Sequence, residues 1–276
     1  MTDIARYIQQ RVRGKGVLNV LSGVSRTYAG GAGTRALSEA ARLRHRTRPP
    51  RYTMVAIETM SGCNYRCSFC PVGTMKMPTG RMPLALYEKL LDQLADFTGV
   101  LHPYLFNEPL LDRRLPELVR MAAERTRASI SIQTNGSKLT PELAEELTRY
   151  ATVVVNDYTT DNSVLDRLRR YPARPRLVLV DRNPDATLTN RAGNVPNRPT
   201  VRLKQFCARP FTEFYVTHDG RAVLCCQDWG YREVMGDLNT ETIEQVWHSE
   251  RYAAVRARLL RRERTGLCAG CDFPGI

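Results

Sequence analysis

Three cysteines in the first third of the chain have a spacing that suits an iron–sulfur cluster. Cys63, Cys67 and Cys70 follow the pattern Cys-x3-Cys-x2-Cys, directly after the apolar run 54–57, which is typical of a strand. Three thiolates on one short loop can each hold one iron of a 4Fe–4S cube and leave the fourth iron open to another ligand. A zinc loop is the alternative, but structural zinc prefers four ligands, and this loop offers three cysteines without a histidine.

A second set of cysteines lies near the C-terminus: Cys207, Cys225, Cys226, Cys268 and Cys271. The apolar runs 214–216 and 222–224 flank an Asp-Gly pair, which predicts a β-hairpin between Cys207 and Cys225. Helical segments over 242–247 and from 251 to about 262 then lead to the last two cysteines. Hairpin and helix together predict a four-thiolate site, which suits either zinc or an iron–sulfur cluster.

Length and composition favour a cytosolic protein. The 276 residues suffice for one large domain, or one domain with a small appendix. No apolar run reaches the roughly 18 residues of a membrane span, and no signal-peptide core follows the first residues. In the reducing cytosol, clustered cysteines indicate metal rather than disulfides.

The positive charge is concentrated in an N-terminal arm. Residues 1–51 hold 11 basic and 2 acidic side chains, which is +9 of the formal +13. Such an arm can contact RNA, an acidic peptide or an anionic substrate, or it can be a solvated helical face. We do not expect a nucleic-acid partner, because the remaining 225 residues carry only +4.

The chain beyond the arm alternates strands and helices. Within the arm, one amphipathic helix is predicted over 2–13 and a second near 34–45, after Gly30, Gly31 and Gly33. The βα alternation predicts a parallel sheet with right-handed crossovers, in five or six units, too few for a closed eight-fold barrel. The predicted strands are 52–60, 99–106, 129–134, 153–155 and 177–180, and the predicted helices are 83–96, one from Pro116, 140–149 and 162–170.

The first cysteine motif, with Phe69 before its last cysteine, resembles the signature of the radical SAM superfamily. The resemblance implies that the open iron binds the amino and carboxylate groups of S-adenosylmethionine (SAM). The reduced cluster would then cleave SAM to a 5′-deoxyadenosyl radical that removes a hydrogen atom from substrate. It also implies an α/β fold, a partial (β/α)6 TIM-like barrel that is open on one side.

The same resemblance implies SAM contacts at the carboxyl ends of three strands, where barrel enzymes place their chemistry. The family commonly has Gly-Gly-Glu-Pro after the second strand; here Phe106 and Asn107 replace the glycines, while Glu108 and Pro109 remain. Glu108 would accept the SAM ammonium. The implied SAM contacts are Phe69, Asn107, Glu108, Pro109, Thr134, Asn135 and Asn156. For the ends of the third and fourth strands, a solvent-facing strand end is the simpler alternative.

The C-terminal cysteines resemble the shortened SPASM domain called twitch, which carries one auxiliary 4Fe–4S cluster. The resemblance implies Cys207, Cys225, Cys268 and Cys271 as its ligands, with Cys225 preferred over Cys226 because of the 18-residue step from Cys207. Cys226 is then a buried thiol, a substrate contact or the true ligand. The implied organisation is a basic arm over 1–51, a radical SAM barrel over 52–200 and a twitch-like domain over 201–276, with a β-hairpin and a helix in the last.

Length and cluster number are similar to those of the twitch-type cyclitol dehydrogenases of aminoglycoside biosynthesis. In these an arginine before the first auxiliary cysteine lies at the substrate; here Arg191 takes that place, 16 residues before Cys207. Arg191 would orient the substrate or ease loss of its hydroxyl proton, or else be a loop arginine that pairs with the SAM carboxylate or a strand end. Arg191 and Cys226 are therefore the catalytic candidates.

The predicted function is oxidation of a small polar natural-product intermediate, with an external reductant such as flavodoxin or ferredoxin. One alternative is maturation of a ribosomal peptide by a cross-link or an epimerisation, for which Cys226 would return hydrogen. Another is redox-neutral epimerisation of a sugar or cyclitol. A non-catalytic iron–sulfur or RNA-binding protein is not expected, because Cys63, Cys67, Cys70 and Glu108 are all present.

Overall fold

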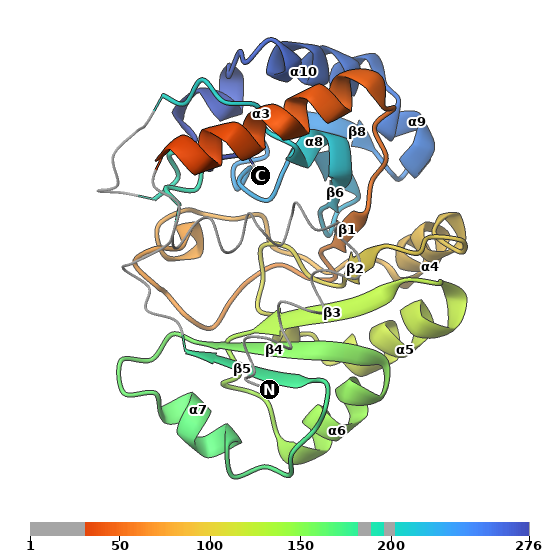
Figure 1. The fold of residues 1–276 in the computed structure, drawn as a ribbon. Coiled ribbons are helices and arrows are strands. Elements are labelled where there is room, and N and C mark those ends of the chain that lie inside the picture. The colour runs from red at the N-terminus through yellow and green to blue at the C-terminus, as the bar shows by residue number, and fades with distance from the viewer. Residues whose placement is uncertain (1–30, 182–188, 196–201, 276) are drawn as a thin grey trace.

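The computed structural model describes residues 31–181, 189–195 and 202–275, which form an eight-stranded mixed sheet with helices on both sides (Figure 1). The strand order is β5-β4-β3-β2-β1-β6-β7-β8. The pairs among β1 to β6 are parallel, and the pairs β6–β7 and β7–β8 are antiparallel. The strands are β1 (Met54–Ile57), β2 (Val100–His102), β3 (Ser129–Thr134), β4 (Ala151–Asp157), β5 (Leu177–Asp181), β6 (Glu213–Val216), β7 (Arg221–Val223) and β8 (Val234–Asp237).

The helices fall into two groups. Those that connect the first parallel strands include α4, α5 and α6, which lie along one side of β2 to β4, whereas α3, α9 and α10 lie near β6 to β8 (Figure 1). The helices are α3 (Gly31–Thr47), α4 (Leu84–Gln93), α5 (Leu115–Arg125), α6 (Pro141–Tyr150), α7 (Ser163–Leu168), α8 (Arg209–Thr212), α9 (Ile243–Trp247) and α10 (Glu250–Leu260). Three short 3-10 turns are η1 (Pro71–Gly73), η2 (Pro109–Leu111) and η3 (Gly266–Gly270).

The predicted α/β fold with a partial parallel barrel is confirmed, and the structure bears out the start signals of two helices, α5 and α6. Thr140 caps α6 by accepting a hydrogen bond from the backbone N–H of Leu143, and Pro116 lies in the first turn of α5. The second helix of the arm was predicted to begin after Gly33, but α3 begins at Gly31 and includes Gly33. The helix predicted over 2–13 lies outside the described residues.

The sixth parallel strand does not belong to a further βα unit that follows β5 in the chain, as the predicted series of consecutive βα units implied. β6 comes from the hairpin region after residue 200, and it pairs with β1 rather than with β5. All four residues of β1 are buried, because sheet neighbours and side chains cover the strand on every side. A strand buried on both faces has a continuous apolar sequence, which explains why polar residues do not alternate with apolar ones in Met-Val-Ala-Ile. β8, which extends the hairpin, was not predicted from the sequence.

The hairpin turn between β6 and β7 requires glycine at position 220. Gly220 has φ of +88°, and a Cβ there would lie 2.6 Å from Nδ2 of Asn239. The backbone N–H of Leu238 also donates to the carbonyl of Gly220 at 2.8 Å, so this turn holds the start of the loop that follows β8. The left-handed conformation is costly for any residue with a side chain.

Gly220→Ala should lower the free energy of unfolding by about 1–2 kcal/mol, the cost of a left-handed alanine. Gly230→Ala is the matched control, because Gly230 has no left-handed φ and its nearest atoms would lie 3.6 Å from the new Cβ. The control should change stability by less than about 0.5 kcal/mol. Urea denaturation of both variants measures the difference. Equal effects would mean that the turn tolerates a side chain.

Candidate active site

A cavity of about 390 Å³ lies inside the open barrel. It is lined by β1, by the carboxyl ends of β2, β3 and β4, by the first cysteine loop, by Arg191, and by parts of the segments 208–215 and 273–275. Small-molecule and cofactor sites usually enclose about 300–1,000 Å³. The cavity therefore has the size and the position of an active site in a barrel enzyme.

The three cysteines of the first loop all line this cavity. The backbone N–H of Cys70 donates to the carbonyl of Cys67 at 3.0 Å, and the N–H of Tyr65 donates to Sγ of Cys63 at 3.4 Å. Burial raises the pKa of Cys63, and it raises that of Cys67 to about 11, with the charges of the neighbouring thiols adding to both. All three thiols belong to one eight-residue loop on the cavity wall, and binding iron would release their protons.

Glu108 joins the ends of β2 and β3 at the cavity wall. It is 3% exposed. Its Oε1 accepts hydrogen bonds from Thr134 Oγ1 at 2.5 Å and from the backbone N–H of Leu110, and its Oε2 accepts from the N–H of Asn135 at 2.8 Å. Burial raises the pKa of Glu108 in spite of these three donors. A desolvated carboxylate at a cavity wall is a favourable partner for an ammonium group.

Other predicted SAM contacts also line the cavity, with one exception. Nδ2 of Asn107 is buried without a hydrogen-bond partner, and Asn135 donates from Nδ2 to Oδ1 of Asn64 at 3.0 Å. Asn156 and the Phe69 ring, whose centroid lies 5.1 Å from that of Tyr158, complete this wall. Pro109 does not line the cavity but begins η2, which Glu108 caps. Its contact with SAM stays a prediction.

Both catalytic candidates reach the same cavity. Arg191 has φ of +52°, and its Nε is buried without a hydrogen-bond partner. Burial raises the pKa of Cys70, and the backbone N–H of Val72 and the charge of Arg191 oppose that rise, so the guanidinium lies near this thiol. Cys226 also lines the cavity, whereas its neighbour Cys225 does not.

The second cysteine set gathers behind this wall. Burial raises the pKa of Cys268 to about 12, with the charges of Cys207 and Cys271 next in effect. Burial likewise raises the pKa of Cys225, with contributions from Cys226 and Cys268. Backbone N–H groups donate to Sγ of Cys225 and to Sγ of Cys271, each at 3.4 Å, as is usual for cluster thiolates. Among the described residues, no three Cys, His, Asp or Glu side chains are spaced closely enough to hold a single metal ion.

Sequence reasoning missed several polar residues of the cavity, among them the neighbouring group of Arg209, Glu213 and Tyr215. Nε of Arg209 lies 3.4 Å from Oε2 of Glu213, and the hydroxyl of Tyr215 donates to the same carboxylate. One signal was available, because positions 213 and 215 alternate onto one face of the predicted strand.

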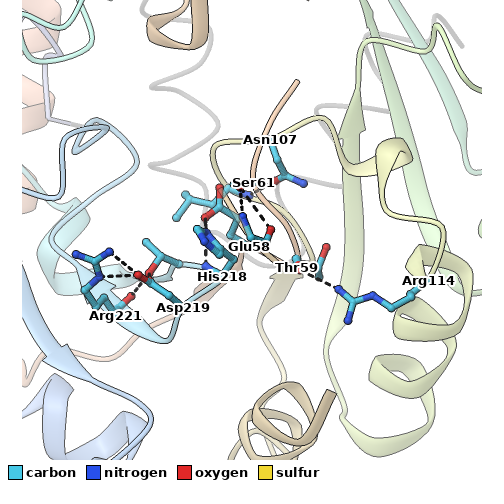
Figure 2. Close-up of polar contacts among 11 residues, drawn as sticks. Glu58, Thr59, Ser61, Asn107, Arg114, His218, Asp219 and Arg221 are labelled. Atoms are coloured by element: carbon cyan, nitrogen blue, oxygen red, sulfur yellow. Dashed lines mark hydrogen bonds and ion pairs between the residues drawn. The ribbon is translucent and has the colours of Figure 1, made fainter. Parts of the chain in front are cut away.

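A buried acid–base pair fixes the base of the first cysteine loop (Figure 2). Oε2 of Glu58, directly after β1, accepts from the backbone N–H of His218 at 3.2 Å and from its ring Nδ1 at 3.1 Å. The His218 ring packs against Gly80, where a Cβ would lie 2.7 Å from Cδ2, and Gly80 in turn bonds Ser61 at 2.8 Å. The loop before Cys63 is thus tied to the hairpin turn between Cys207 and Cys225.

The Glu58–His218 pair predicts a pH-dependent contribution to stability. The hydrogen bond from Glu58 raises the pKa of His218, and burial opposes the rise. The stabilisation is therefore complete below the unfolded pKa of about 6.5 and is lost as the pH rises through the higher folded value. His218→Gln should cost on the order of 1 kcal/mol near pH 6 and less near pH 9, measured by urea denaturation.

The matched control for this prediction is His248→Gln. His248 is exposed, and its Nε2 lies 3.2 Å from Oε2 of Glu244. Exposed pairs contribute little, so this variant should show a smaller effect at every pH. A His218→Gln effect that is the same at both pH values would contradict the charged pair.

Comparison with known proteins decides the family. The model of the radical SAM superfamily matches residues 57–191, and that of the SPASM iron–sulfur cluster-binding domain matches residues 207–272. A curated relative from Niallia circulans, S-adenosyl-L-methionine-dependent 2-deoxy-scyllo-inosamine dehydrogenase, is 30% identical over 234 residues, which cover 80% of this chain and 93% of the relative. The chain belongs to the radical SAM superfamily.

Solved structures agree with this assignment. BtrN in complex with AdoMet and 2-DOIA is 28% identical, with a TM-score of 0.75 over 82% of this chain and 95% of BtrN. SuiB of Streptococcus suis bound to the precursor peptide SuiA shares the fold at 13% identity, with a TM-score of 0.58 over 84% of this chain and 80% of SuiB. No helix among the described residues is long and apolar enough to cross a membrane.

The predicted class of enzyme and cofactors is confirmed. The protein is a radical SAM oxidoreductase that uses SAM and iron–sulfur clusters and acts on a small molecule. The thiols of both cysteine sets fit this chemistry, because all are buried or half-buried and each set includes cysteines whose sulfur accepts a backbone N–H.

Proposed function

We propose that the protein oxidises a secondary alcohol of an aminocyclitol to a ketone. The observation that carries the proposal is that Cys63, Cys67 and Cys70 share one cavity with Arg191 and Cys226, and that Cys226 follows Cys225 of the second cysteine set directly in the chain. A substrate in this cavity has a radical source on one side and an electron acceptor on the other. The dehydrogenase activity of the relative from Niallia circulans, which this chain matches over most of its length, points to the same reaction.

In the proposed arrangement Cys63, Cys67 and Cys70 hold the SAM-binding cluster, and Cys207, Cys225, Cys268 and Cys271 hold an auxiliary cluster. When bound, SAM and the reduced first cluster would supply a radical that takes the hydrogen atom from the carbinol carbon, the hydroxyl proton would be released, and the auxiliary cluster would supply an acceptor for the remaining electron. The SAM site consists of Phe69, Asn107, Glu108, Pro109, Thr134, Asn135 and Asn156. Because Glu108 is desolvated, it is the partner of the SAM ammonium.

Arg191 orients the reacting alcohol in this proposal. Its Nε is a buried donor without a protein partner, and a substrate hydroxyl would satisfy it. The rings of Phe69, Tyr158 and Trp229 line the cavity and exclude water from a reactive intermediate. We further propose a basic arm over 1–51, a barrel over 52–200, a twitch-like domain over 201–276, and an external reductant such as flavodoxin or ferredoxin.

Anaerobically reconstituted enzyme with SAM, a reductant and 2-deoxy-scyllo-inosamine should form 5′-deoxyadenosine and a ketone in about equal amounts. Arg191→Ala should lower kcat/KM by about 10- to 100-fold, the effect of losing a charged hydrogen bond, and should leave iron content unchanged. Arg174→Ala is the control, because Arg174 pairs with Glu145 outside the cavity. An epimer in place of the ketone would overturn the oxidation and favour the redox-neutral alternative.

Iron analysis should separate the two neighbouring cysteines. The parent should bind about eight irons and Cys225→Ala about four, whereas Cys226→Ala should keep about eight and lose turnover. The triple variant of Cys63, Cys67 and Cys70 to alanine should keep about four irons but cleave no SAM. Loss of iron from Cys226→Ala but not from Cys225→Ala would make Cys226 the ligand and remove it from the substrate.

A further inference from the structure

A polar group of three side chains lies in the cavity apart from the cysteine loop and Glu108. Arg209 comes from α8, and Glu213 and Tyr215 come from β6; all three line the cavity. In the register of the sheet, Glu213 lies beside Met54 and Tyr215 lies beside Ala56. Both neighbours on β1 also line the cavity, and neither brings a polar group, so this stretch depends on β6 and α8 for its polarity.

The three side chains are buried together. Tyr215 is 1% exposed, and the side chains of Arg209 and Glu213 are 15% and 14% exposed. The Tyr215 hydroxyl holds the Glu213 carboxylate, and the guanidinium carbon of Arg209 lies 3.5 Å from the centroid of the Phe273 ring. These contacts fix both charged groups in place before any ligand arrives.

The guanidinium is nevertheless incompletely satisfied. Nε and Nη1 of Arg209 are buried without a hydrogen-bond partner, although Nε lies 3.4 Å from the Glu213 carboxylate. Buried donors without partners are rare and costly, and a pair that served stability alone would be fully hydrogen-bonded. Since both residues line an open cavity, the missing acceptors would come from a bound molecule.

The other residues of the cavity show where that molecule would lie. Arg209, Glu213 and Tyr215 line it together with Cys226. Cys226 in turn shares the cavity with Arg191 and the first cysteine loop. A small molecule that contacts Arg209 and Glu213 therefore extends towards Arg191 and the reacting centre.

We propose that Glu213 and Arg209, positioned by Tyr215, form the subsite that recognises an amino-substituted, polyhydroxylated ring. Glu213 accepts hydrogen bonds from the ring ammonium, and the unpartnered donors of Arg209 bind a ring hydroxyl. This inference rests on the proposed function and names the residues that give it its substrate preference.

The chemistry of the group excludes other classes of small substrate. A carboxylate next to the binding position repels phosphates and carboxylates, and a guanidinium at the same place repels a ligand that has only cations. A ring with one ammonium and several hydroxyls satisfies both groups, because hydroxyl oxygens accept from the guanidinium and the ammonium donates to the carboxylate. A site that binds a specific polar group also rejects the analogue that lacks it.

The test compares Glu213→Gln with the parent, on two ligands: 2-deoxy-scyllo-inosamine and its analogue with a hydroxyl in place of the amino group. The parent should bind the amine more tightly. Glu213→Gln should weaken binding of the amine by about 10- to 100-fold and change binding of the hydroxyl analogue by less than about threefold. Calorimetry on anaerobic, SAM-loaded enzyme measures both, and iron content should stay at the parental value.

Two further variants keep the test decisive. Tyr215→Phe removes only the hydroxyl that donates to the Glu213 carboxylate, and it should give a smaller loss of preference for the amine. Glu146→Gln, at an exposed helix position, is the matched control and should change binding of neither ligand. Equal weakening of both ligands, or no change in either, would overturn the inference while the proposed function stands. A parent enzyme that binds and oxidises no aminocyclitol would overturn the proposed function itself.

Discussion

The parallel pairing of β1 with β6 is the contact on which the rest of the site depends. β1 ends directly before the first cysteine loop, and β6 begins shortly after Cys207 and leads through the hairpin to Cys225. The register from Met54 with Glu213 to Ile57 with Val216 therefore brings the first cysteine loop and Cys226, from distant parts of the sequence, to one cavity. A slip by one residue would turn Glu213 and Tyr215 to the other face of the sheet.

The pairing is reinforced at the carboxyl end of both strands. The backbone N–H of Glu58 donates to the carbonyl of Val216 at 2.9 Å, and its carboxylate then holds His218. Arg114, at the start of α5, donates to the carbonyl of Thr59 at 3.0 Å (Figure 2). The stretch between β1 and Cys63 is thus held by β6 and by the start of α5, so that the cysteine loop starts from a fixed position although much of the loop itself is only partly buried.

Local pattern was enough for much of the fold and for the motif residues of the site. β3 has the bounds predicted from its alternation, and the cysteines and Glu108 were found because their chemistry demands those residue types at that spacing. The pairing of β6 with β1 could not be predicted from the sequence, because no local pattern specifies a partner strand so distant along the chain. β8 was missed because Val-Met-Gly-Asp is short and contains a glycine, which is unfavourable in strands. Arg209 and Glu213 belong to no motif, and only the tertiary structure places them in the cavity.

The polar groups of the cavity divide into two sets with different tasks. On one side Glu108 is already satisfied by three donors from the ends of neighbouring elements, so its position is fixed by the protein before SAM binds. On the other side Arg191 and Arg209 keep buried nitrogen donors without protein partners. All members of the superfamily bind SAM, so residues at the strand ends of the barrel can form its site. The substrate differs between members and must be recognised by residues outside these strand ends. Under the proposed function those residues come from the loop at Arg191 and from β6 and α8, which lie next to Cys207 and lead to Cys225 in the chain. In that proposal the same stretch of chain sets substrate preference and the position of the electron acceptor.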